Sequence, residues 1–122
     1  MNTMYWCKIF KSPTLHQKHH VVEYAPVIGK NHMKFIHHMI LHECDTSKSK
    51  DFSKWEEYAK HEGRPCYGSE MPNDWDKCIT PVITWAIGSK GKFQGNLKKI
   101  MLKHRWYKFD IAYEHEKSVW IS

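Results

Sequence analysis

The sequence predicts one domain of the all-β class, an antiparallel β-sandwich braced by disulfide bonds. Short runs of β-branched and aromatic residues alternate with long polar connections, which is typical of a sandwich. The four cysteines form an even set without a CxxC pair, which favours two disulfides over a zinc or redox site. The length of 122 residues suits a single domain spanning residues 1–122, or part of one.

The strands follow from local composition between turn-forming residues. β-Branched and aromatic side chains fill the first predicted strand, which lies between Pro13 and a Gly-Lys-Asn turn. The second strand is a short apolar run between polar residues, and the third follows a polar stretch. In the fourth, apolar and polar residues alternate. The predicted strands span residues 19–28, 34–44, 79–88 and 106–113.

Two connections lack strand character. Residues 45–73 are mostly polar, and they predict no more than a helical turn at 55–60, because Gly and Pro residues after it stop a longer helix. Residues 89–95 predict a Gly/Lys loop. Beyond this loop, residues 97–104 place apolar side chains at helical spacing, but a loop followed by a strand is favoured.

The cysteines indicate an oxidising compartment, since disulfides persist outside the cytosol. No export signal accompanies them, because Met1 is followed closely by Trp6 and Cys7 without a basic or an apolar leader segment. No apolar run approaches the roughly 18 residues of a membrane-spanning helix. We therefore expect a fragment of a longer secreted protein, with membrane association only through parts not present here.

The formal net charge is +6, and basic residues gather late in the chain. Such a patch raises the hypothesis of a nucleic-acid or heparin partner. None of the usual nucleic-acid motifs accompanies it, so a solvated basic face and no nucleic-acid partner are favoured. The residues concerned are Lys90, Lys92, Lys98, Lys99, Lys103, Arg105 and Lys108.

Ten histidines include two adjacent pairs, His19-His20 and His37-His38, which raises the hypothesis of a metal site. Imidazole is a common ligand of transition metals in proteins. Adjacent residues of a regular strand point to opposite faces, so one metal ion cannot take both histidines of a pair unless the strand is bent or bulged. Without such a distortion, one histidine would lie in the core and one outside. Surface or loop positions are expected for His32, His42 and His61.

An ordered set of short motifs runs from residue 4 to residue 88. The motifs are Met4-Tyr5-Trp6-Cys7-Lys8, His19-His20-Val21-Val22, Phe35-Ile36-His37-His38-Met39-Ile40-Leu41, Cys44, Cys66, Met71-Pro72, Cys78 and Trp85-Ala86-Ile87-Gly88. This collinear set resembles the N-terminal domain of the copper type II, ascorbate-dependent monooxygenases of the dopamine beta-hydroxylase-like kind. Peptidylglycine alpha-hydroxylating enzymes are more distant, and residues 89–122 resemble the family only weakly.

The resemblance implies a jelly-roll sandwich, a secretory or vesicle-lumen location, and copper bound by His37 and His38. It also implies the disulfides Cys7–Cys66 and Cys44–Cys78, whereas spacing alone leaves all three pairings of four cysteines open. The family does not use the pair at His19 and His20 as copper ligands.

A third copper ligand is expected from a strand of the form apolar-Glu-Val-His-Tyr-Asp-Asn. The best local match is residues 109–115, which places Ala112 at the ligand position. Two histidines alone should hold copper weakly. His115, expected on the opposite strand face, or His104 is a candidate substitute, and an error in the gene model between Ser89 and Trp120 is an alternative explanation.

In the family reaction, the first copper passes on an electron from ascorbate, and the second copper, in the following domain, binds oxygen and hydroxylates a small-molecule substrate. The leading hypothesis is that this chain supplies the electron-transfer copper site, without hydroxylase activity of its own. The alternative is a catalytically inactive remnant or binding module with the same sandwich. We also expect the domain to stop before its last strands, and the resulting open sheet edge favours pairing with another chain.

Overall fold

The computed structural model describes residues 2–13, 19–20, 23–24, 27–29, 31–49, 52–86, 93–94, 101–102 and 106–115. The elements, in chain order, are β1 (Asn2–Lys11), β2 (His19–His20), β3 (Glu23–Tyr24), the 3₁₀ turn η1 (Met33–Phe35), β4 (Ile36–Glu43), α1 (Ser53–Lys60), β5 (Arg64–Pro65), the 3₁₀ turn η2 (Asn73–Lys77), β6 (Thr80–Ala86), β7 (Phe93–Gln94), β8 (Met101–Leu102) and β9 (Trp106–His115).

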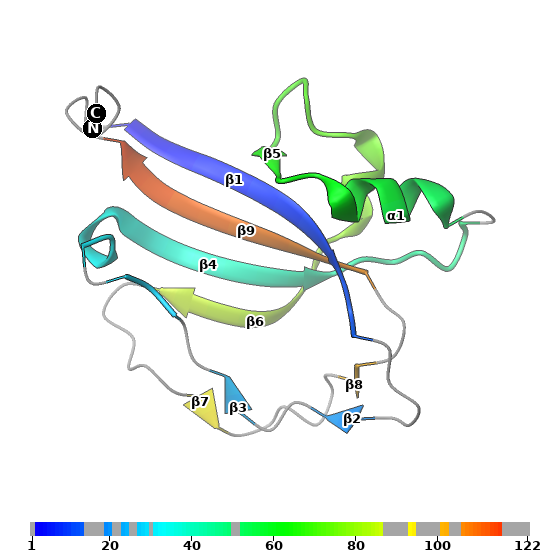
Figure 1. Ribbon diagram of the computed structural model, residues 1–122, viewed down its shortest axis with the longest axis horizontal. Coiled ribbons are helices and arrows are strands. Elements are labelled where there is room, and N and C mark those ends of the chain that lie inside the picture. Colours follow the sequence, from blue (N-terminus) through cyan, green and yellow to red (C-terminus); the bar gives the residue numbers. More distant parts are fainter. Residues whose placement is uncertain are drawn as a thin grey trace.

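The main sheet has five antiparallel strands in the order β5-β1-β9-β4-β6 (Figure 1). The strand that comes last in the sequence, β9, lies between β1 and β4. Two short ladders, β2 with β8 and β3 with β7, lie below β6 in Figure 1. This arrangement confirms the all-β, antiparallel prediction and is consistent with a sandwich.

The predicted strands are largely confirmed. The apolar run at 34–44 forms β4, with residues 34–35 in the preceding 3₁₀ turn, and the alternating segment at 106–113 forms β9, extended to His115. Of the run at 79–88, residues 80–86 form β6, and 87–88 lie outside the described residues.

Other segments differ from the prediction, and β1 is a ten-residue strand that was not among the four strands predicted from local composition. Of the described residues in the run at 19–28, those of β2 and β3 are in strands and residues 27–28 are not, so the strand does not extend to residue 28; residues 21–22 and 25–26 lie outside the described residues. The segment at 89–95, predicted to be a loop, contains β7. Its partner is β3, which lies within the run at 19–28. Residues 101–102 form β8 on β2, although the segment at 97–104 was expected to be a loop, while 95–100 and 103–105 lie outside the described residues.

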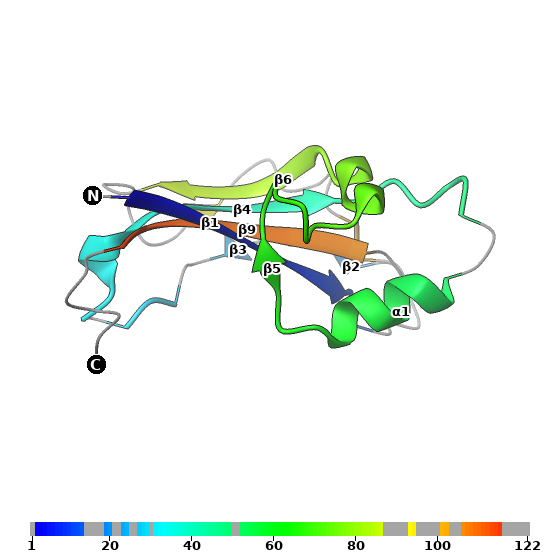
Figure 2. The same ribbon diagram turned by 90° about the horizontal axis from the view of Figure 1, so that it is seen from above.

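A tryptophan core joins α1 to the sheet. The helix has eight residues, longer than the predicted turn at 55–60, because Trp55, Tyr58 and Ala59 share one side at helical spacing and pack into the core. The Trp55 ring lies 6.2 Å from that of Trp106 on β9, and Tyr58 contacts both Trp55 and Trp75 edge-on. Figure 2 shows α1 beside the end of β1. No helix in the described part of the chain is long and apolar enough to cross a membrane.

Both predicted disulfides are confirmed. Cys7 of β1 is bonded to Cys66, which follows β5, and Cys44 after β4 is bonded to Cys78 after η2. The bridges close loops with sequence separations of 59 and 34 residues. They therefore attach the long polar connection to the sheet at two points.

Replacing Tyr58 with phenylalanine should lower the free energy of unfolding by about 1 kcal/mol, the usual net value of one hydrogen bond. The Tyr58 hydroxyl donates to Asp74 Oδ2 at 2.8 Å and so ties α1 to η2. Burial, together with Asp74, raises the pKa of Tyr58 to about 12. Phenylalanine keeps the ring contacts, so urea denaturation isolates the hydroxyl. In an alkaline titration, Tyr58→Phe should lose a tyrosine that ionises late; an unchanged titration and midpoint would contradict the assignment.

Candidate metal centre

The histidine pair lies at an irregularity of β4. Ile36 pairs with Tyr113 of β9, and His38 pairs with Ala112, so β4 has one more residue than β9 between these two pairs. The register shift has the form of a β-bulge, in which two residues oppose one and a side chain is re-aimed. The strict alternation of faces is broken at His37. Both histidines are partly exposed, so neither is the buried core histidine of a regular strand.

A row of four paired residues crosses the sheet at His38. The row runs from Tyr5 of β1 through Ala112 and His38 to Ala86 of β6. Two inter-strand spacings separate Tyr5 from His38, or about 10 Å between their backbones. Their ring centroids are only 6.3 Å apart, so the two side chains lean toward each other over the alanine between them. Ala112 is accordingly 0% exposed.

The predicted position of the third ligand thus opposes His38, but its methyl group cannot coordinate a metal. Of the proposed substitutes, His115 pairs through its backbone with Asn2 at the end of β9, and its side chain is not described. His104 lies outside the described residues. Among the described side chains, those of Tyr5 and His38 lie close together, His37 is the chain neighbour of His38 at the bulge, and sequence analysis did not single out Tyr5.

His42 was predicted at the surface or in a loop, and this prediction is wrong. It lies within β4 with its side chain 13% exposed, and its Nδ1 is 3.8 Å from Asp110 Oδ1, too far for a hydrogen bond. Burial lowers the pKa of His42, Lys108 lowers it further, and Asp110 partly opposes this shift. His32 and His61 are exposed, as predicted.

Lys108 was assigned to a solvated basic face, and this assignment is also wrong. Its side chain is 3% exposed, and its Nζ lies 3.5 Å from Asp110 Oδ2 and over the ring of Tyr67. The Tyr67 hydroxyl donates to the same carboxylate oxygen at 3.1 Å, from a residue with a φ of +60°. Lys108 and Asp110 are two residues apart in a strand and therefore lie on one face. Their spacing in the predicted strand at 106–113 could have indicated this ion pair from the sequence.

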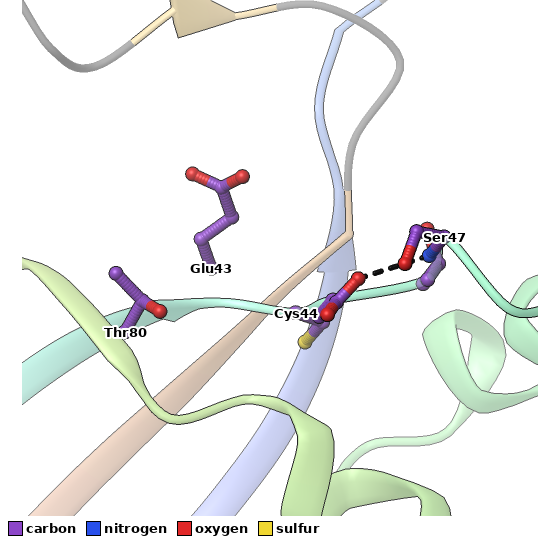
Figure 3. Close-up of a pocket in the computed structure, with 6 residues that line it drawn as sticks. Glu43, Cys44, Ser47 and Thr80 are labelled. Carbon is purple, nitrogen blue, oxygen red and sulfur yellow. Dashed lines mark hydrogen bonds between the residues drawn. The ribbon is translucent and has the colours of Figure 1, made fainter.

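One other grouping of potential ligand atoms does not provide a metal site, and one cavity lies away from the histidine pair. Cys7, Cys66 and Asp110 bring three potential ligand atoms within 4.8 Å of one another, but both sulfurs belong to the disulfide and carry no proton or free thiolate. A cavity of about 420 Å³ lies where β4 ends, at the opposite end of that strand from the histidine pair (Figure 3). It is lined by Glu43, Cys44, Asp45, Thr46, Ser47 and Thr80.

The fold and the site define a disulfide-braced all-β domain with a histidine pair on a bulged strand. Residues 1–117 match the family described as copper type II ascorbate-dependent monooxygenase, N-terminal domain, and the chain belongs to this family. The match continues through β9, beyond the motifs that end at residue 88.

Several animal proteins are similar to the chain. MOXD1 homolog 1 of Drosophila melanogaster is 40% identical over 97 residues, which is 76% of this chain and 14% of that protein. DBH-like monooxygenase protein 1 of Homo sapiens is 34% identical over 74% of the chain and 14% of its own length. Human dopamine beta-hydroxylase is 27% identical over 72% of the chain and 13% of its own length. The chain thus spans about a seventh of these relatives.

Proposed function

We propose that the chain binds copper through His37 and His38 and serves as the electron-transfer site of an ascorbate-dependent monooxygenase that hydroxylates a small substrate with O₂. The bulge of β4 carries this proposal, because it removes the geometric objection to two adjacent strand residues binding one ion. Membership of the family supports copper as the metal and ascorbate as the reductant. We further propose that the sandwich is a jelly-roll.

The residues at the bulge fit a copper ion in their chemistry. Two imidazoles offer borderline nitrogen ligands that suit copper before and after reduction. His38 has small neighbours in register on both sides, Ala112 and Ala86, so its imidazole is not crowded by a bulky residue on an adjacent strand. When bound, copper would supply one-electron chemistry. The protein would hold the ion at a partly exposed position, where a soluble reductant has access.

Ala112 favours a second candidate function, a non-catalytic binding module that keeps the braced sandwich. Its methyl group stands opposite His38, at the position predicted for a third ligand, and loss of a ligand weakens control over a redox metal. Ascorbate-dependent oxygen consumption by the isolated chain would rule out this candidate. Copper binding without such turnover is compatible with both candidates, because the family reaction requires a second copper.

Location and partners follow from the same features. We propose a secreted or vesicle-lumen location, because both disulfides require an oxidising compartment. A nucleic-acid partner is not proposed, since Lys108 is buried against Asp110 and is withdrawn from the basic surface. Within the described part of the main sheet β6 is an outer strand, and we propose it as the edge through which two chains would associate.

Isothermal titration of Cu(II) into the oxidised protein tests the site. His37→Ala and His38→Ala should each weaken binding by about 100-fold or more, because loss of a direct ligand should cost at least as much as loss of an outer-shell contact. His32→Ala is the matched control, since this exposed histidine precedes the same strand. Equal effects at all three positions would mean that copper binds adventitiously and that the site assignment is wrong.

A further inference from the structure

We propose that Tyr5 is a protein ligand of the copper site and takes the coordination position that Ala112 leaves open. This inference rests on the proposed copper site at His37 and His38. It assigns phenolate coordination by the N-terminal strand to a site whose other ligands lie on β4. The resulting ligand set would be two imidazoles and one phenolate.

The convergence of two rings carries the inference. Tyr5 and His38 belong to strands that are not neighbours in the sheet, yet their rings approach to 6.3 Å between centroids at an interplanar angle of 48°. Only the Ala112 methyl lies between them in the register. A histidine in place of Ala112 would need the space that the rings of Tyr5 and His38 occupy above the alanine. Tyr5 therefore fills the side of the site that a third imidazole would otherwise occupy.

Tyr5 is also accessible to an incoming metal ion. Its side chain is 46% exposed even though its ring leans over the sheet. Asp110, a charged oxygen donor on the same face, is two residues before Ala112 and is engaged by Lys108 and the Tyr67 hydroxyl. Among the described side chains of this face, Tyr5 is the oxygen donor in register with the third-ligand position.

The coordination step is an acid–base reaction. The phenol O–H bond breaks, an oxygen–copper(II) bond forms, and the proton passes to buffer, with no electron transferred. Metal binding by ionisable ligands releases protons in this way. Coordination should therefore produce a phenolate-to-copper(II) charge-transfer band in the visible spectrum, which imidazole ligands alone do not give, together with a proton release that depends on Tyr5.

The test is a Cu(II) titration of the oxidised full chain, followed by visible absorption and by calorimetry in buffers of different ionisation enthalpy. The wild-type protein should develop the band with one equivalent of Cu(II). Tyr5→Phe should abolish the band, weaken binding by about 10-fold or more, and release one proton fewer. Tyr113→Phe is the matched control, because this neighbouring tyrosine is in register with Met4 and Ile36 instead; it should keep the band.

The possible failures are distinguishable. If binding is lost in His37→Ala and His38→Ala but no band appears, or if the band survives in Tyr5→Phe, the Tyr5 assignment is wrong and the proposed copper site stands. If neither histidine variant weakens binding, both proposals fall. Phenylalanine retains the ring that covers Ala112, so Tyr5→Phe should fold, and its far-ultraviolet circular dichroism spectrum should match the wild type.

Discussion

Asp110→Ala should destabilise the domain by about 3–5 kcal/mol, the usual effect of breaking a buried ion pair from one side. The Lys108 side chain is 3% exposed, and its contact with Asp110 at 3.5 Å is the ion pair that offsets its loss of water. Alanine would also remove the acceptor of the Tyr67 hydroxyl. The position is central, because β9 lies between β1 and β4. Urea denaturation of the oxidised protein measures the loss.

A double replacement separates the charge effect from packing. Lys108→Met together with Asp110→Leu removes both charges and keeps similar volumes, so it should recover most of the stability lost in Asp110→Ala. Lys108→Met alone should be destabilising as well, because it leaves the carboxylate buried with fewer partners. If Asp110→Ala unfolds at the wild-type urea concentration, Lys108 must reach water by another path and the ion pair does not hold the core.

Replacing Cys44 and Cys78 together with alanine should cost about 4 kcal/mol. The bridge closes a loop with a separation of 34 residues, so its removal restores conformational entropy to the unfolded chain. Both cysteines are almost fully buried, at 4% and 1% exposure, beside Trp75 of η2. Alanine keeps the site apolar and avoids a free thiol. Thermal unfolding monitored by tryptophan fluorescence provides the measurement.

The other bridge serves as the comparison. Cys7→Ala with Cys66→Ala opens a loop with a separation of 59 residues, and loop length alone predicts a loss greater by about 0.5 kcal/mol. Reduction of the wild-type protein should combine both losses and unfold the domain near room temperature. If the Cys44 and Cys78 double variant melts with the wild type, the bridge only links segments that the tryptophan core already holds together.

The sequence predicted the strands with periodic patterns well and the isolated pairs poorly. β4 carries an apolar run and β9 an alternating pattern, each long enough to be recognised locally, and the disulfide pairing followed from the family resemblance. β3 and β7 have two residues each, so their pairing depends on tertiary contacts that no local pattern encodes. Lys108 was wrongly assigned to a solvated basic face because basic residues precede it in the sequence. Asp110 can be recognised as its partner only once both residues are placed on one face of a strand.

The sequence suggested the residues of the proposed site but not their geometry. The motif around His37 and His38 suggested the pair, and the match at residues 109–115 placed Ala112 at the expected position of a third ligand. An extra residue relative to a neighbouring strand cannot be recognised before that neighbour is known. The sequence could therefore state only that both histidines can bind one metal ion if the strand is bulged, and could not predict the bulge itself. Tyr5 of β1 approaches His38 of β4 across β9, which lies between them. This contact cannot be predicted without knowing the order of the strands in the sheet.

The position of β9 has a consequence for biosynthesis. Asn2 pairs with His115, and β4 also needs β9 as its neighbour, so β1 and β4 cannot be joined until residues 106–115 have been made. Such long-range pairing makes folding slow. During that interval Cys7 and Cys44 are available to oxidise with incorrect partners, and the growing chain exposes an unpaired strand. We therefore expect productive maturation to depend on disulfide isomerisation after translation of β9.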